Sequence, residues 1–160
     1  MGMPITVRRA TEDDAGELTR LRAEMLTAMG TDASSLAGEA WRAGTEAHFR
    51  ERLADVLRFA AFVAEAGGPG LVACAVGWLD RRLPSPTNPS GDVGYVANMS
   101  TDQEWRGQGC GRATLTALLD WMRTRGVPRV DLLATDAGEP LYRSLGFRPP
   151  HLTALTLPLD

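Results

Sequence analysis

Apolar residues recur with two different spacings along the chain, and the spacing separates expected strands from expected helices. Strands are predicted where apolar and polar residues alternate, or where short apolar runs lie between turns: residues 5–10, 59–66, 71–79, 93–101, 130–134 and 151–159. Helices are predicted where apolar residues return every three or four positions: residues 11–29, 36–57, 109–125 and 139–144. The strongest helical pattern is that of residues 109–125, with Leu115, Leu118, Leu119 and Met122 on one face.

Glycine and proline mark the connections between these elements. The run Gly67–Gly70 lies between two apolar segments and is typical of a β-hairpin turn. Three prolines make the segment 83–92 a surface loop, because proline breaks both helices and central strands. The resulting order is β-α-α-β-β-β-α-β-α-β, which predicts an α/β fold with a mixed central sheet flanked by helices. We expect residues 1–160 to form a single domain.

Composition narrows the class of protein further. The chain has 160 residues and a formal net charge of −3, and a surplus of lysine and arginine, which nucleic-acid binding needs, is absent. No apolar run reaches the length of a membrane span, so neither nucleic acid nor membrane is an expected partner. The two cysteines are too few for a disulfide scaffold. We expect a cytoplasmic globular protein without a metal.

Three glycines lie within five residues where an expected strand joins the longest expected helix. Gly107, Gly109 and Gly111 would let backbone N–H groups approach an anion, and the helix dipole adds positive potential there. Arg106 and Arg112 flank them with positive charge. A Walker loop would continue with lysine and serine or threonine, and a dinucleotide fingerprint would need a third glycine where Arg112 stands. The spacing therefore excludes both of these phosphate loops.

The segment Arg106-Gly-Gln-Gly-Cys-Gly111 resembles the Arg/Gln-x-x-Gly-x-Gly/Ala pattern of the GNAT superfamily of acyl-CoA-dependent N-acyltransferases. Asn98–Thr101 precedes it by the family's spacing for the central strand, and Leu141–Phe147 is similar to the family signature Leu-Tyr-x-x-Leu-Gly-Phe. The expected order of elements also resembles the family's. The resemblance implies a GNAT-like fold and transfer of an acetyl group from acetyl-CoA, as co-substrate, to an amine by direct attack in a ternary complex.

The resemblance also implies which residues contact the cofactor. The loop would hold the pyrophosphate by its backbone N–H groups, the central strand would contact the pantetheine arm, and a threonine stands where the family often has asparagine. These expected contacts are Met99, Ser100, Thr101, Arg106, Gly107, Gln108, Gly109, Cys110, Gly111, Arg112 and Thr135.

Two catalytic roles follow from the same resemblance. A bulge near Met99–Thr101 would leave backbone N–H groups free for the oxyanion, with Thr101 as the named contact. Tyr142 holds the position of the acid that protonates the departing thiolate, and a phenol and a thiol have pKa values close enough for that transfer. Cys110 is expected to be a small buried apolar residue and not a nucleophile, because no histidine lies nearby in the sequence.

The general base is open at this stage. Asn98 stands on the central strand where many family members carry glutamate, and an amide cannot accept a proton. Glu24 is the candidate that we name, and the alternatives are His48, Asp102, Glu104, or no dedicated residue.

The acceptor is expected to be a primary amine of a small molecule or a peptide. Its site would lie among residues 11–57 and the loop 83–92, where Arg81 and Arg82 stand beside the loop. The spacing of Trp41, Phe49 and Trp78 favours core packing over an acceptor pocket. The alternative function is a non-catalytic GNAT-like module that binds CoA. A homodimer is a further possibility, with the strand expected at residues 151–159 as the pairing element.

Overall fold

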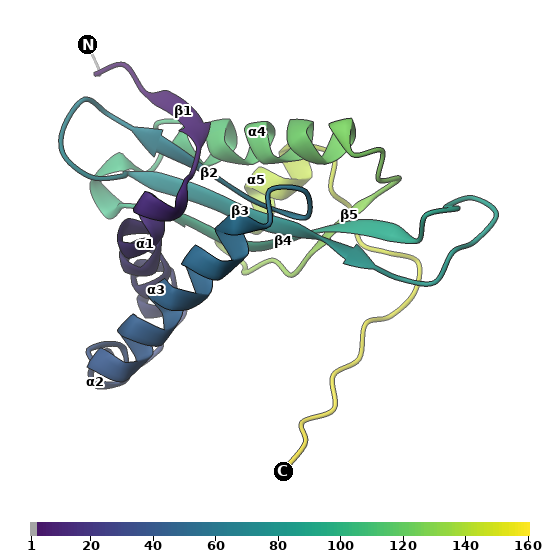
Figure 1. Ribbon diagram of the computed structural model, residues 1–160, viewed down its shortest axis with the longest axis horizontal. Coiled ribbons are helices and arrows are strands. Elements are labelled where there is room, and N and C mark those ends of the chain that lie inside the picture. The colour runs from purple at the N-terminus through teal and green to yellow at the C-terminus, as the bar shows by residue number, and fades with distance from the viewer. Residues whose placement is uncertain (1–2) are drawn as a thin grey trace.

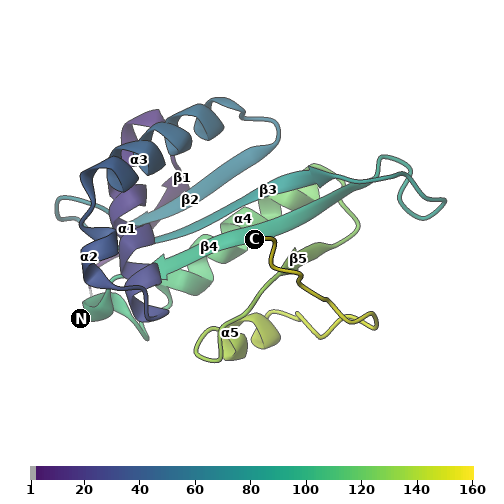
Figure 2. The same cartoon turned by 90° about the horizontal axis from the view of Figure 1, so that it is seen from below.

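The computed structural model describes residues 3–160, which form a five-stranded sheet between two layers of helices (Figure 1). The strands are β1 (Thr6–Arg9), β2 (Phe59–Glu65), β3 (Ala73–Arg81), β4 (Asp92–Thr101) and β5 (Val130–Leu132). The helices are α1 (Ala15–Ala28), α2 (Ala33–Leu36), α3 (Glu39–Ala54), α4 (Cys110–Thr124) and α5 (Glu139–Ser144), with 3₁₀ turns η1 (Glu12–Asp14) and η2 (Gln103–Trp105). Figure 2 shows α1, α2 and α3 on one side of the sheet and α4 on the other.

The α/β architecture expected from the sequence is confirmed, with two differences in detail. The helix expected over residues 36–57 is two helices, α2 and α3, because the chain turns at Gly38 before α3 begins. The strand expected over residues 151–159 is wrong: among the described residues no strand follows β5. Alternating leucines need a neighbouring strand, and the prolines Pro149, Pro150 and Pro158 cannot donate to one. The tail instead leads away from the sheet with its leucines exposed (Figure 1).

The strands lie in chain order, and the last pairing is short. The pairs β1–β2, β2–β3 and β3–β4 are antiparallel. The pair β4–β5 is parallel. This parallel pairing joins only Gly94, Tyr95 and Val96 to residues 130–132. Within residues 3–160, the edge of β4 from Ala97 to Thr101 therefore has no strand beside it on the β5 side.

A β-bulge lies close to the point where β5 separates from β4. Val76 of β3 pairs with Asn98, but Gly77 pairs with Val96, so Ala97 is the extra residue. A bulge bends its strand and reorients the side chains on either side of it. It lies two residues before the Met99–Thr101 segment in which the sequence placed it.

Two apolar cores cover the two faces of the sheet. One core contains Leu18 and Leu21 of α1 with Phe49 of α3, packed on β2 and β3. The other contains the apolar face of α4, including Leu118 and Met122, packed on β2, β3 and β4. These cores fix α1 and α4 on opposite sides of β4.

We expect the change Gly77→Ala to lower the free energy of unfolding by about 2 kcal/mol, as overpacking of a core does. The added Cβ would lie 2.6 Å from the backbone oxygen of Tyr95 and 2.8 Å from Cε of Met122. Gly44→Ala is the matched control, because Gly44 lies in α3 with open space around its Cα and alanine favours helix. Urea denaturation of both variants measures the difference. Equal stability of the two would contradict the close packing at Gly77.

Candidate functional site

The loop between β4 and α4 takes a conformation that requires glycine at two positions. Gly107 has φ 74° and Gly109 has φ 86°, and no atom lies within 4 Å of a Cβ built on either. The requirement is therefore one of backbone conformation and not of space. Arg106 Nε donates to the backbone oxygen of Thr101 at 3.2 Å, which holds the loop against the end of β4.

The backbone N–H groups of residues 107–112 have no hydrogen-bond partner within the described part of the chain. The first amide of α4 that is paired is that of Ala113, which donates to the oxygen of Gly109 at 2.9 Å. Unpaired amides at a helix N-terminus, together with the helix dipole, form a binding site for anions. Arg106 and Arg112 are exposed on either side of these amides. This segment fits a diphosphate group.

The free edge of β4 supplies further unpaired donors. Asp102 N–H donates to the backbone oxygen of Val72 on the β3 side, at 2.8 Å. Because backbone groups alternate in direction along a strand, the N–H groups of Met99 and Thr101 face the opposite, unpaired edge. They lie next to the bulge, where a bound carbonyl oxygen would find donors.

Residues from β4, α4 and α5 converge at Gly111. A methyl group on Gly111 would lie 3.5 Å from Oγ1 of Thr101, 3.7 Å from Leu141 and 3.9 Å from Met99. The structure thus brings together the strand, loop and C-terminal signature that are far apart in sequence. Ser100, by contrast, is buried, and its side chain alternates to the other face of the sheet.

Tyr142 lies on α5 beside this convergence. Its ring packs edge-on against Phe147, with 5.9 Å between ring centroids, and it contacts the α4 core. Its hydroxyl has no hydrogen-bond partner among the described residues, and it is not one of the fully buried polar atoms. Partial burial raises the pKa of Tyr142 above its ordinary value of 10.0. The phenol is therefore protonated at neutral pH and free to donate.

Thr135 and Arg112 both take structural roles around α5. The hydroxyl of Thr135 accepts the N–H of Gly138 at 3.2 Å, and its backbone oxygen accepts the N–H of Glu139. Arg112 donates to Oγ of Ser144 at 2.6 Å and so joins α4 to α5. These contacts set the position of Tyr142 relative to the loop.

Both cysteines are buried and not bonded to each other. Cys110 packs in an apolar cluster, where burial raises the pKa of its thiol. Burial raises the pKa of Cys74 to about 12. Because the thiolate is the nucleophilic form, neither residue is set up for covalent catalysis.

The four candidate bases have no recorded interaction with Tyr142 in the described part of the chain. Glu24 is exposed and lies two positions from Arg22, which places it on the opposite side of α1 from the sheet. His48 is exposed on α3, and Glu104 is exposed in η2. Asp102 accepts two N–H groups of Arg20, at 2.9 and 3.2 Å. Within residues 3–160, none of the four forms a hydrogen bond or an ion pair with Tyr142.

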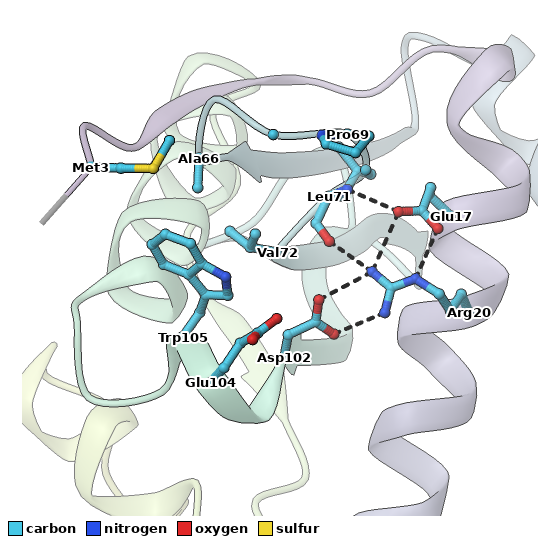
Figure 3. A pocket seen from close by; sticks show the side chains of 12 residues that line it. Met3, Glu17, Arg20, Ala66, Pro69, Leu71, Val72, Asp102, Glu104 and Trp105 are labelled. Atoms are coloured by element: carbon cyan, nitrogen blue, oxygen red, sulfur yellow. Dashed lines mark hydrogen bonds and ion pairs between the residues drawn. The ribbon is translucent and has the colours of Figure 1, made fainter.

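The bond between Asp102 and Arg20 belongs to an ion-pair network at the end of β4 (Figure 3). Arg20 also bonds Glu17 and the backbone oxygen of Leu71, and Glu17 accepts the N–H of Leu71 at 2.9 Å. A hollow with a volume of about 350 Å³ lies beside this network. It is bordered by Trp105 and Glu104. The network ties α1 to β4 at the point where the glycine loop begins.

Phe49 and Trp78 have the packing roles that the sequence favours for them. Phe49 is buried in the core, and Trp78 stacks on Phe59 with 6.3 Å between centroids. Trp41 is half-buried on α3. Asp136 is exposed, and Glu139 pairs with Arg143.

One pair beside the free edge of β4 was missed from the sequence: Arg22 on α1 and Asn98 on β4, joined by a bond of 3.0 Å from Nη1 to Oδ1. The available signal was the helical position of Arg22, which lies on the same side as the apolar residues Leu18 and Met25. An arginine on the apolar side of a helix is a signal of a special role, because charged residues rarely face a core.

Residues 3–160 contain no cluster of three histidine, cysteine or acidic side chains arranged to hold a metal ion. None of the helices in that range has the length and hydropathy needed to cross a membrane.

The chain is similar to known proteins in both sequence and structure. The model of the acetyltransferase (GNAT) family matches residues 26–147. A glucosamine 6-phosphate N-acetyltransferase of Trypanosoma brucei brucei is 34% identical over 56 residues, which are 35% of this chain and 38% of that protein. The match thus spans little more than a third of that relative.

Two solved structures are similar over almost the whole chain. A GCN5-related N-acetyltransferase from Ralstonia eutropha JMP134 is 28% identical with a TM-score of 0.81, covering 96% of this chain and 99% of that one. An acetyltransferase from Clostridium acetobutylicum, solved with acetyl-CoA, is 25% identical with a TM-score of 0.81, covering 96% of each.

Proposed function

The chain belongs to the acetyltransferase (GNAT) family, and from this premise we propose that it moves an acetyl group from acetyl-CoA to a primary amine of a small molecule or peptide. The observation that carries the proposal is the row of unpaired N–H groups from Gly107 to Arg112 beside the free edge of β4. A family member whose loop had lost this geometry would have no place for the cofactor.

The residues present fit coenzyme A. The amides of residues 107–112 would hold its diphosphate, with Arg106 and Arg112 adding positive charge. The backbone oxygen of Met99, on the same free edge of β4, would accept an N–H of its pantetheine arm, which leaves the N–H groups of Met99 and Thr101 available. When bound, acetyl-CoA supplies an acetyl group activated as a thioester.

Groups of the chain would then act on two atoms of the thioester, its carbonyl oxygen and its sulfur. The free N–H groups of Met99 and Thr101 stabilise negative charge on the carbonyl oxygen, a contribution worth about 3 kcal/mol per donor in other enzymes. Tyr142 Oη donates its proton to the departing sulfur, and the raised pKa keeps that proton available. Attack is direct, because both cysteine thiols are buried.

In this proposal no carboxylate of the chain accepts the proton that the incoming ammonium group must lose. Glu24, His48 and Glu104 are exposed, and Asp102 is held by Arg20. An amine that arrives neutral, or that loses its proton to water, needs no base from the chain. The related glucosamine 6-phosphate enzyme supports an amino sugar as one acceptor to try first.

The test is release of free CoA from acetyl-CoA with a panel of amino sugars, amino acids, polyamines and peptides. Amine-dependent release supports the proposal, and product mass identifies the acetylated amine. Calorimetric titration with CoA separates the remaining outcomes. Binding without transfer to any amine would favour a non-catalytic CoA-binding module, and absence of binding would overturn the assignment of the loop.

A further inference from the structure

Arg22 is a half-buried residue on the sheet-facing side of α1, and its guanidinium bonds the side chain of Asn98 on β4. Its neighbours on that side include Leu18, which is fully buried, and Met25. Among residues 3–160, no carboxylate forms an ion pair with it. A charge held partly out of water without an opposite charge costs free energy, so its position calls for an explanation.

Arg20, two positions earlier on the same helix, shows the usual arrangement. Its guanidinium bonds the carboxylates of Glu17 and Asp102, and these bonds raise its pKa further above the ordinary value. The positive charge of Arg20 is therefore compensated within the chain. That of Arg22 is not.

The side chain that holds Arg22 is neutral. Asn98 is 3% exposed on β4, and its Oδ1 accepts Nη1 of Arg22 at 3.0 Å. Its Nδ2 points to Sγ of Cys74 at 3.6 Å, which fixes the orientation of the amide. An amide orients the guanidinium but leaves its full positive charge, and four of its five N–H donors remain for other partners.

The pair lies at the part of β4 that β5 leaves unpaired. Asn98 follows the bulge residue Ala97 and precedes Met99, whose N–H faces the free edge of β4. Side chains alternate along a strand, so Asn98 lies on the α1 face of the sheet and Met99 on the α4 face. The loop expected to hold the cofactor leads into α4, on the α4 face of the sheet. The α1 face, where Asn98 lies, is therefore available to a second substrate.

We propose that Arg22 binds an oxyanion, a carboxylate or a phosphate, carried by the amine acceptor, and that Asn98 positions it. The inference rests on the proposed function and adds the class of acceptor. A guanidinium with free donors pairs with either group in a planar, two-point geometry. The acceptor is thus an amine with an anionic group, and not a polyamine or a neutral amino sugar.

Matched pairs of acceptors test this directly. Glucosamine 6-phosphate is compared with glucosamine, and L-alanine with L-alaninamide, so that the two arms distinguish phosphate from carboxylate. We expect the wild type to prefer the anionic member of at least one pair. In Arg22→Gln the kcat/KM for that member falls about 10- to 100-fold, mainly through KM, as for a hydrogen bond between charged groups. The value for the neutral member changes less than twofold.

Two further variants separate recognition from structure. Asn98→Asp keeps the size of the side chain but neutralises Arg22, so it should cause a similar loss for the anionic acceptor while KM for acetyl-CoA is unchanged. Arg22→Lys should restore part of the preference. Arg123→Gln is the control, because it removes an equal charge from the exposed end of α4, where Asp120 is the only ion-pair partner of Arg123 among residues 3–160.

Calorimetry on the CoA-loaded protein keeps the inference testable if no acetyl transfer is found. Tighter binding of an anionic amine to the wild type than to Arg22→Gln supports it even without turnover, and in that case only the proposed transferase function fails. Equal use of both members of each pair by the wild type overturns it. So does an anionic preference that survives in Arg22→Gln, or binding of neither member.

Discussion

Replacing Tyr142 with phenylalanine is expected to lower kcat about 100-fold, the size of effect typical of a positioned general acid. The variant loses only the hydroxyl, and that hydroxyl bonds no group in residues 3–160, so packing against Phe147 is retained. KM for acetyl-CoA should change little, because the amides expected to hold the cofactor lie in residues 107–112. Steady-state kinetics with the best acceptor of the panel measures both constants.

The pH profile gives a second readout for Tyr142. Burial raises its pKa above 10.0, so the phenol keeps its proton as pH rises and loses it only in the alkaline range. The wild-type kcat should therefore fall above pH 10, and this alkaline limb should be absent in Tyr142→Phe. Both measurements depend on the same proton.

Tyr95 provides the matched control, since the chain has only two tyrosines. Tyr95 lies on β4 and packs against Trp78, with 5.4 Å between ring centroids. Tyr95→Phe should leave kcat and its pH profile unchanged. An unchanged kcat in Tyr142→Phe, with both variants folded, would remove Tyr142 from the proposed mechanism.

The elements that carry local signals could be predicted from the sequence. Helix α4 has an apolar face at helical spacing and begins directly after Gly109, and α5 begins and ends at the residues expected for it. The glycine loop could also be predicted, because glycine readily adopts the positive φ values that Gly107 and Gly109 have in the structure.

The features that depend on distant partners could not be read in this way. The sequence predicts a strand over residues 130–134, but pairing with β4 ends at Leu132, and this early end leaves the edge at Met99 free. The bulge at Ala97 exists only because Gly77 pairs with Val96. Alternation in residues 151–159 is a strand signal without a neighbouring strand, and the bond of Arg22 to Asn98 joins positions 76 residues apart.

The change Gly111→Asp should separate cofactor binding from stability more sharply than any other substitution in the loop. Gly111 lies in the first turn of α4 without a positive φ, and the contacts of an added Cβ there are at ordinary distances. A carboxylate at a helix N-terminus interacts favourably with the dipole, so the melting temperature should not fall. The same charge would occupy the place that we assign to the diphosphate.

We expect KM for acetyl-CoA to rise about 100-fold or more in Gly111→Asp. Like charges about 4 Å apart repel by about 4 kcal/mol at an effective dielectric constant of about 20, and each 1.4 kcal/mol is about one tenfold step in affinity. Gly111→Asn has the same shape without the charge and should show a much smaller rise. Calorimetric titration of both variants with CoA measures the difference. Equal affinity in the two would mean that the N-terminus of α4 does not hold the anionic part of the cofactor.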